Sequence, residues 1–312
     1  MTTPSRIVSL ISSATEILYL LGLGDRVIGV SHECDYPEDV RTKPRLTRSN
    51  VDSLASSLSI DDQVKSLLGA GLPLYEIDAT QLLSRKPDLI LTQAQCDVCA
   101  IKYEDVVAVI RDQPDLRDVP IIALNPQSLS DVLSDIQNVA DLVGVSEIGR
   151  AVVHELSARV SEVQNKTGRL ALDEFPRVAC IEWTDPLMLA GNWMPELVRF
   201  AGGRHDLTQA GLHSGYSSWD DLIRYNPQVI IVMPCGFGLS RSVAEAAELA
   251  ERPGWAELDA VRTGRVFAVD ANAYFNRSGP RLVETLELLA HLIHPDRFDP
   301  PKLSLAPAYQ TV

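Results

Sequence analysis

Four of the chain's five cysteines fall in loops that follow predicted strands, where their thiols could reach one ligand. They are Cys34, Cys96, Cys99 and Cys235. The Cys-x-x-Cys spacing of Cys96 and Cys99 lets two thiolates hold one metal ion from a tight turn, although a single such pair is a weak signal. Cys34 and Cys235 would complete a four-thiolate set for zinc or an iron–sulfur cluster, with His32 or His213 as substitute ligands. Unligated thiols and a redox disulfide are the alternatives.

Aromatic side chains gather in the same group of loops, although only 6% of all residues are aromatic. Rigid rings that line a cleft suit a large, flat and partly apolar ligand. The alternative is that the tryptophans fill an interface between two lobes. The aromatic candidates are Tyr36, Trp183, Trp193, Tyr216, Trp219, Phe237, Tyr274 and Phe275.

Two similar segments indicate how these loops are positioned. Residues 85–93 and 225–233 both read as a helix end, a proline and a continuous apolar run. Such runs are typical of strands buried on both faces of a parallel sheet, and ligands of such sheets bind beyond the carboxyl ends of the strands. We therefore predict an α/β protein with two Rossmann-like lobes and a ligand cleft between them.

Periodicity and composition divide the chain into four parts. Alternating strands and helices predict an N-terminal lobe over residues 1–143 and a C-terminal lobe over residues 172–298. Residues 144–171 contain apolar positions near a 3.6-residue period, which predicts one long helix that joins the lobes stiffly. The tail, residues 299–312, is rich in proline and polar residues, and we expect it to be poorly ordered.

Bulk properties exclude several classes of partner. The net charge is −14, from 28 basic and 42 acidic residues, which argues against nucleic acid and anionic membranes. The sequence has no uncharged apolar stretch long enough to span a bilayer. Residues 7–23 fit a strand and a helix better than an export signal because Glu16 interrupts the apolar run. We therefore expect a cytoplasmic protein, with a periplasmic one as the alternative if a leader has been removed.

Common enzyme signatures are missing from the sequence. It has no phosphate-binding G-x-x-x-x-G-K, no G-x-S-x-G nucleophile elbow and no H-E-x-x-H zinc motif. We therefore expect a protein that is not an enzyme. Redox activity stays open under the cysteine-ligated metal hypothesis.

Several segments resemble the helical-backbone class of substrate-binding proteins, which serve importers of iron chelates and vitamin B12. The matching segments are Ile7-Val8-Ser9-Leu10, Ser13-Ala14-Thr15-Glu16, Gly29-Val30-Ser31, Asp35-Tyr36-Pro37, Lys86-Pro87-Asp88-Leu89-Ile90, Ala190-Gly191-Asn192-Trp193, Ala201-Gly202-Gly203 and Ser278-Gly279-Pro280-Arg281-Leu282. The resemblance extends to about residue 295 and is closest to the cobalamin-binding branch. It implies a corrinoid held edge-on between two α/β lobes, in contact with Tyr36, Trp183, Leu187, Tyr274 and Phe275.

Three departures from the resembled family shape the functional hypothesis. The sequence shows no leader, and cysteines in the cleft are not typical of B12 binders. Family members present an acid on each lobe to the permease; Asp220 is near that position, but Thr80 stands where the first lobe should have one. These departures argue against docking to an ABC permease and favour an intracellular protein that binds a corrinoid such as cobalamin. The alternatives are a cysteine-ligated metal or iron–sulfur protein, and an importer subunit for B12, haem or an iron chelate.

Overall fold

The computed structural model describes residues 3–95, 98, 100–305 and 307–312. The chain forms two compact units. Unit 1 comprises Met1–Pro126 and Ser130–Glu155, and unit 2 comprises Gln127–Leu129 and Leu156–Val312. The division falls inside α6 (Ser146–Thr167), so the long helix predicted from the sequence is present and contributes to both units.

Unit 1 is built on a parallel sheet of four strands in the order β2-β1-β5-β6. The strands are β1 (Ile7–Ser9), β2 (Val27–Val30), β5 (Leu89–Gln93) and β6 (Ile121–Leu124). One face packs against α3 (Ala79–Arg85) and α4 (Tyr103–Arg111), with Leu82 and Val106 in a shared apolar core. α1 (Ser12–Leu20) is tied to β1 by a 2.8 Å hydrogen bond from Thr15 Oγ1 to Ser9 Oγ, and α5 (Leu129–Leu142) follows β6.

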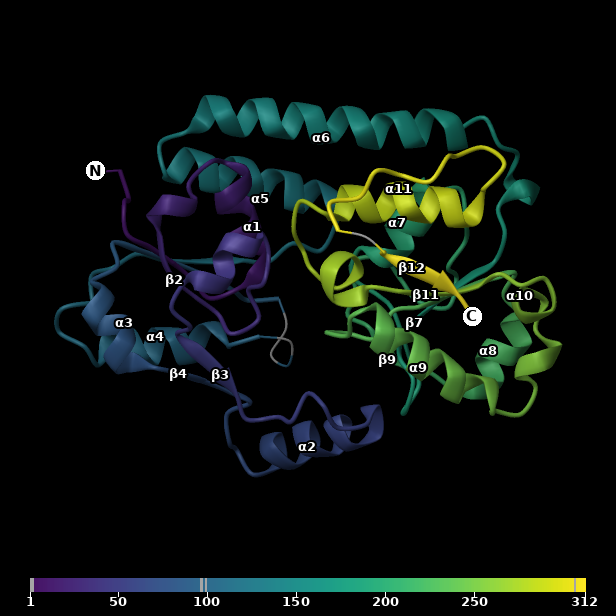
Figure 1. Cartoon of the computed structure of the whole chain (residues 1–312), viewed down its shortest axis with the longest axis horizontal. Helices are drawn as coiled ribbons and strands as arrows, with labels where there is room; N and C mark the ends of the chain where they lie inside the picture. Colours follow the sequence, from purple (N-terminus) through teal and green to yellow (C-terminus); the bar gives the residue numbers. More distant parts are fainter. Residues whose placement is uncertain (1–2, 96–97, 99, 306) are drawn as a thin grey trace. The chain divides into compact units, whose positions relative to one another are not determined.

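A second, smaller sheet in unit 1 carries a helical arm. β3 (Thr47–Ser49) and β4 (Tyr75–Ile77) pair in antiparallel fashion, and α2 (Ser57–Gly69) lies between them in the sequence. Ser56 caps α2 by accepting a hydrogen bond from the backbone N–H of Ser59. Ser57 is the only buried residue of α2, and the helix lies away from the four-stranded sheet (Figure 1). Thr47 and Tyr75 of this small sheet contact His32 in the loop after β2.

Unit 2 contains a six-stranded sheet in the order β12-β11-β10-β7-β8-β9. Its parallel centre is β7 (Val178–Trp183), β10 (Val229–Val232) and β11 (Val266–Val269), and its antiparallel edges are β8 (Met188–Leu189), β9 (Gly215–Tyr216) and β12 (Tyr309–Thr311). α7 (Met194–Phe200) and α11 (Leu282–Ile293) lie on one side of this sheet (Figure 1). α8 (Trp219–Tyr225), α9 (Leu239–Ala250) and α10 (Asp259–Arg262) lie on the other. Helices therefore cover both faces of the parallel strands.

The two similar segments noted in the sequence have matching local structures. α3 is capped by Asp78, which accepts from Gln81 N–H, and α8 is capped by Ser218, which accepts from Asp221 N–H. Both helices end in a left-handed residue, Lys86 at φ 47° and Asn226 at φ 45°, and a proline then leads into the central strand β5 or β10. The predicted α/β fold with two parallel sheets is confirmed, although the sheet of unit 2 is mixed at its edges.

The C-terminal tail has a strand that we did not predict. β12 pairs with β11, with Phe267 opposite Thr311 and Val269 opposite Tyr309. The pairing satisfies backbone groups of the edge strand β11, which gives the tail a place on unit 2. Within the described part of the chain, no helix is long and apolar enough to cross a membrane.

Candidate functional site

The loop that follows β2 presents a histidine in a fixed orientation. His32 Nδ1 lies 2.7 Å from Thr47 Oγ1, and the backbone N–H of His32 donates to the same oxygen at 3.0 Å. The imidazole ring packs against the Tyr75 ring at 5.4 Å between centroids. Burial, together with the nearby charge of Arg45, lowers the pKa of His32 below its ordinary value. The ring is therefore neutral at pH 7.

Cys34, in the same loop, lies in the interior of unit 1. Its side chain is 1% exposed, and its sulfur is 3.2 Å from Thr15 Oγ1. The guanidinium of Arg45 donates to the carbonyl oxygens of Ser31 and Cys34, which closes the turn around the thiol. Cys34 is thus a packed residue of the core of unit 1.

The thiolate site predicted from the four loop cysteines lacks support. Cys96 and Cys99 lie outside the described residues. Among the residues that are described, no group of three or more His, Cys, Asp or Glu side chains could hold a metal ion. Cys235 is half-buried after β10, and burial raises the pKa of the Cys180 thiol inside β7.

In unit 2, the end of β7 and the loop after β10 together form an aromatic surface, of which Trp183 is the half-buried part and Phe237, 6% exposed, is the packed part. The centroid of the half-buried Trp183 ring lies 5.3 Å from the centroid of the Phe237 ring. The Arg241 guanidinium packs over the Phe237 ring, 4.3 Å from its centroid. Arg241 Nε donates to Glu245 Oε1 at 3.2 Å, and Thr184 Oγ1 donates to Glu245 Oε2. A buried carboxylate thus orients the charged group that supports the two rings.

A second polar network fixes the edge of the same sheet. Ser214 Oγ donates to Glu182 Oε2 at 2.7 Å and accepts from the Gly191 N–H at 2.9 Å. The backbone N–H of Asn192 also donates to the Leu212 carbonyl at 2.6 Å. These bonds hold the segment that leads into β9, where Tyr216 is 60% exposed. Tyr216 therefore presents most of its ring to solvent.

The structure buries several of the aromatic residues that were predicted to contact a ligand. Trp193 is 5% exposed and donates from Nε1 to the Phe275 carbonyl at 2.9 Å, while Tyr274 and Phe275 are fully buried. Leu187 belongs to the apolar core of unit 2. Trp219 stacks on Trp255 at 6.0 Å and donates to the Pro253 carbonyl at 2.8 Å. Phe237 is 6% exposed, and the predicted aromatic contacts that retain exposed surface are Tyr36, Trp183, Tyr216 and Trp219.

Two buried arginines in the segment after β11 were not among the predicted site residues. Arg277 is 8% exposed and donates to Asn272 Oδ1 at 3.0 Å, and Arg281 is 4% exposed with its guanidinium 5.4 Å from the Tyr274 centroid. The signal that could have found them is the pair of arginines around Ser278-Gly279-Pro280, directly after a strand-end loop. Arg45, Thr47 and Glu245 were also missed, because each acts through a partner that is distant in the sequence.

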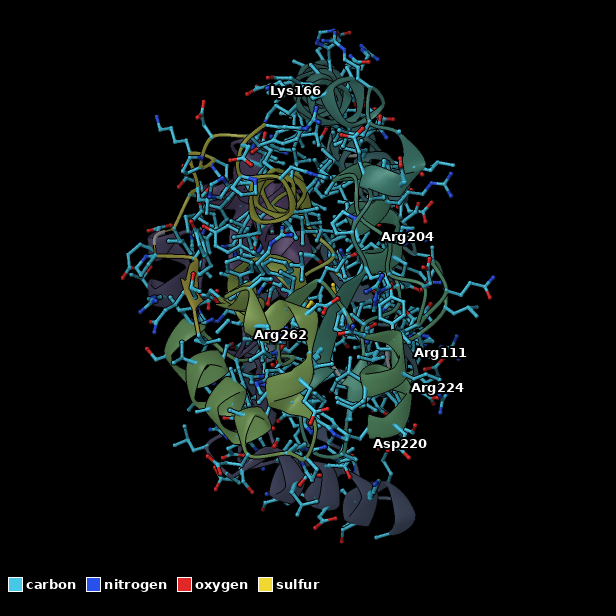
Figure 2. All side chains as sticks on the ribbon, turned by 90° about the vertical axis from the view of Figure 1, so that its right-hand side faces the viewer. Arg111, Lys166, Arg204, Asp220, Arg224 and Arg262 are labelled. Carbon is cyan, nitrogen blue, oxygen red and sulfur yellow. The ribbon has the colours of Figure 1, made fainter. Side chains whose placement is uncertain are left out.

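Asp220, the predicted docking residue, is exposed in the first turn of α8. Figure 2 shows it at the end of this helix, with Arg224 one turn further along. Arg224 pairs at 2.7 Å with Asp221. The Asp220 carboxylate is thus presented on the surface of unit 2.

Comparisons with known proteins place the chain in a family. The family model for periplasmic binding proteins matches residues 7–273. An ABC transporter substrate-binding lipoprotein of Bacillus subtilis is 27% identical over 301 residues, which covers 95% of this chain and 82% of the relative. The vitamin B12-binding protein of Vibrio cholerae is 22% identical over 291 residues, which covers 90% of this chain and 86% of the relative. The periplasmic haem-binding protein RhuT of Roseiflexus is 25% identical, with a TM-score of 0.69 over 93% of this chain and 98% of that one.

These matches correct the predicted location. The expectation of a cytoplasmic protein is wrong, because the matching family is periplasmic and one relative is a lipoprotein of an ABC transporter. The expectation was based on residues 7–23, which form β1 and α1 of the fold, and elements of the fold do not report on export. The family consists of binding proteins rather than enzymes. Because the family model matches residues 7–273 of this chain, the chain belongs to the periplasmic binding protein family.

Proposed function

We propose that this protein is the substrate-binding subunit of an ABC importer and that its cargo is a metal-centred macrocycle, foremost a corrinoid such as cobalamin. Relatives named for an ABC transporter and for vitamin B12 cover at least 90% of the chain. The haem-binding protein RhuT has the same fold. Haem or an iron chelate is therefore the second candidate cargo.

The half-buried ring of Trp183, packed against the 6% exposed ring of Phe237, is the observation that carries this proposal. Trp183 is the last residue of β7 and Phe237 lies in the loop after β10, at the carboxyl ends of the strands, where ligands of parallel sheets bind. A corrinoid is large, flat and apolar over much of its surface, so the ring of Trp183, held rigid by Phe237, would bind it with little loss of side-chain entropy. The Arg241 guanidinium behind Phe237 keeps the pair in place.

Docking to a permease is part of the proposal. The absence of an acid at Thr80 first argued against docking, but relatives named as ABC transporter components outweigh a single substitution. Asp220 is exposed on α8 and offers a carboxylate to a basic partner. We infer that unit 2 contributes the stronger electrostatic contact with the permease.

Equilibrium titration with hydroxocobalamin, haemin and a ferric chelate tests the proposed cargo. We expect one of the three to stay bound through dialysis. Because a central aromatic anchor typically contributes 2 kcal/mol or more, Trp183→Ala should weaken binding at least about tenfold. The matched control is Trp219→Ala, since Trp219 is also half-buried in unit 2 but stacks on Trp255. Retention of no cargo, or an equal loss in both variants, would contradict the proposal.

A further inference from the structure

The helical arm of unit 1 exposes several large apolar side chains. α2 lies away from the four-stranded sheet (Figure 1), and Ser57 is its only buried residue. Exposed apolar side chains that cluster on one element mark a site of interaction, whereas scattered ones need no explanation. The exposed leucines on α2 and at its two ends are Leu54 at 86%, Leu58 at 47%, Leu68 at 41% and Leu72 at 53%.

These leucines belong to a regular row, which we call the α2 row. Successive members are separated by four, three, four, three and four residues. This alternation is the spacing of a coiled-coil seam, which keeps side chains along one side of a helix. The α2 row consists of Leu54, Leu58, Asp61, Lys65, Leu68 and Leu72.

Hydrogen bonds from the backbone hold the outer two leucines at the ends of the helix. The Leu54 N–H donates to Asp52 Oδ1 at 3.0 Å, two residues before the N-cap Ser56. The Leu72 N–H donates to the Leu67 carbonyl at 2.9 Å, which closes the last turn of α2. Both side chains are therefore fixed next to the exposed leucines of the helix itself.

The centre of the α2 row is an ion pair. Lys65 Nζ lies 2.6 Å from Asp61 Oδ2. The Lys65 side chain is 57% exposed and that of Asp61 is 10% exposed, so the lysine is the member with room to reach a neighbouring molecule. A charged residue within an apolar seam fixes the register of helix pairing at some cost in stability.

The α2 row is complementary to itself. Asp61 and Lys65 lie two residues on either side of Gln63, and the leucines lie five and nine residues on either side. When two copies run antiparallel, each leucine therefore meets a leucine and each Asp61 meets a Lys65. A parallel arrangement would set Asp61 against Asp61, and such like-charge contacts are unfavourable.

We propose that the α2 row is the interface of a homodimer, in which the α2 helices of two copies pack antiparallel about a two-fold axis level with Gln63. The occupant is a second copy of this chain because the complement of the row is the row itself. An anionic membrane is disfavoured as occupant by the net charge of −14. This inference goes beyond the proposed function and does not depend on the cargo.

Sedimentation equilibrium of the full-length protein tests the dimer. α2 has 13 residues, so the interface is small, and we expect a reversible monomer–dimer equilibrium at concentrations up to about 1 mM. Asp61→Lys or Lys65→Glu sets like charges against each other at both central positions and should weaken dimerisation at least about tenfold. Ser66→Lys is the matched control, because Ser66 is exposed on α2 outside the row.

Mixing the two charge variants separates pairing between copies from an effect on the helix itself. Both variants lose the Asp61–Lys65 ion pair within α2, and each alone should stay monomeric at concentrations where the wild type dimerises. In the mixture, the two lysines of one copy meet the two acids of the other. Heterodimers should therefore form with at least the affinity of the wild-type dimer.

Three outcomes would overturn the inference. One is a wild type that stays monomeric up to about 1 mM, which would assign the α2 row to a different occupant. The others are a mixture that forms no heterodimer, and a loss of dimerisation in Ser66→Lys equal to that in Asp61→Lys. All three leave the cargo proposal standing, because that proposal is tested by titration with the cargo.

Discussion

The buried carboxylate of Glu245 offers a direct test of how the aromatic surface of unit 2 is supported. Its side chain is 3% exposed and accepts hydrogen bonds from Thr184 Oγ1 and Arg241 Nε. Glu245→Gln keeps the shape of the side chain but removes its charge. The Arg241 guanidinium then loses the charged partner that holds it over Phe237.

The size of the effect follows from the change in hydrogen-bond type. A hydrogen bond to a charged group contributes about 1.5–3 kcal/mol, against about 0.5–1.5 kcal/mol for a neutral one. Glu245 makes two such bonds, so the substitution should cost about 2 kcal/mol once the 30% exposure of Arg241 is allowed for. For a unit of this size, the loss corresponds to a fall in Tm of about 4–8 °C.

Tryptophan fluorescence isolates the response of unit 2, because all four tryptophans lie in that unit. Thermal unfolding should therefore show an earlier fluorescence transition in Glu245→Gln. Glu248→Gln is the matched control, since Glu248 is exposed on the same helix. If the two variants unfold within about 0.5 kcal/mol of each other, the carboxylate does not support the loop and the reasoning is refuted.

Two further predictions concern the edge of unit 2 and the charge on α5. A Cβ at Gly191 would press against the Leu212 carbonyl and come within 2.8 Å of Ser214 N, whereas one at Gly215 would meet nothing within 4 Å. Gly191→Ala should therefore lower stability by about 1–3 kcal/mol, as measured by fluorescence-detected unfolding, and Gly215→Ala should serve as its neutral control. Burial, with a smaller effect from the charge of Asp131, raises the pKa of Asp135 to about 6. A carboxyl whose folded pKa exceeds its unfolded value destabilises the protein as pH rises, so Asp135→Asn should stabilise unit 1 at pH 7 by about 1–2 kcal/mol, after discounting solvent screening. Urea unfolding followed by circular dichroism should show that gain disappear below pH 4. Asp141→Asn should show no gain, because hydrogen bonds from Ser146 and Gln137 lower the pKa of Asp141. A gain that persists below pH 4 would mean that Asp135 acts by some means other than its charge.

Elements whose signals are local could be predicted closely from the sequence. In α4, α5, α8 and β11, the apolar periodicity and the flanking residues that mark the ends all lie within the element's own segment. The start of α9 at Leu239 is harder to predict, because its N-cap Gly238 has no side chain to mark it. The short strands β8, β9 and β12 were missed because two or three residues carry almost no periodicity.

Residue types and strand order by themselves determined that polar and aromatic side chains follow the parallel strands of two α/β units. Only the tertiary structure decided which of them face solvent. Trp183 ends the central strand β7 and Phe275 follows the central strand β11, yet Trp183 is half-buried and Phe275 is fully enclosed. The chemistry of His32 likewise depends on Thr47, a partner from another strand. Such contacts form when distant segments pack together, and the free energy of that packing depends on the whole fold rather than on any local pattern of residues.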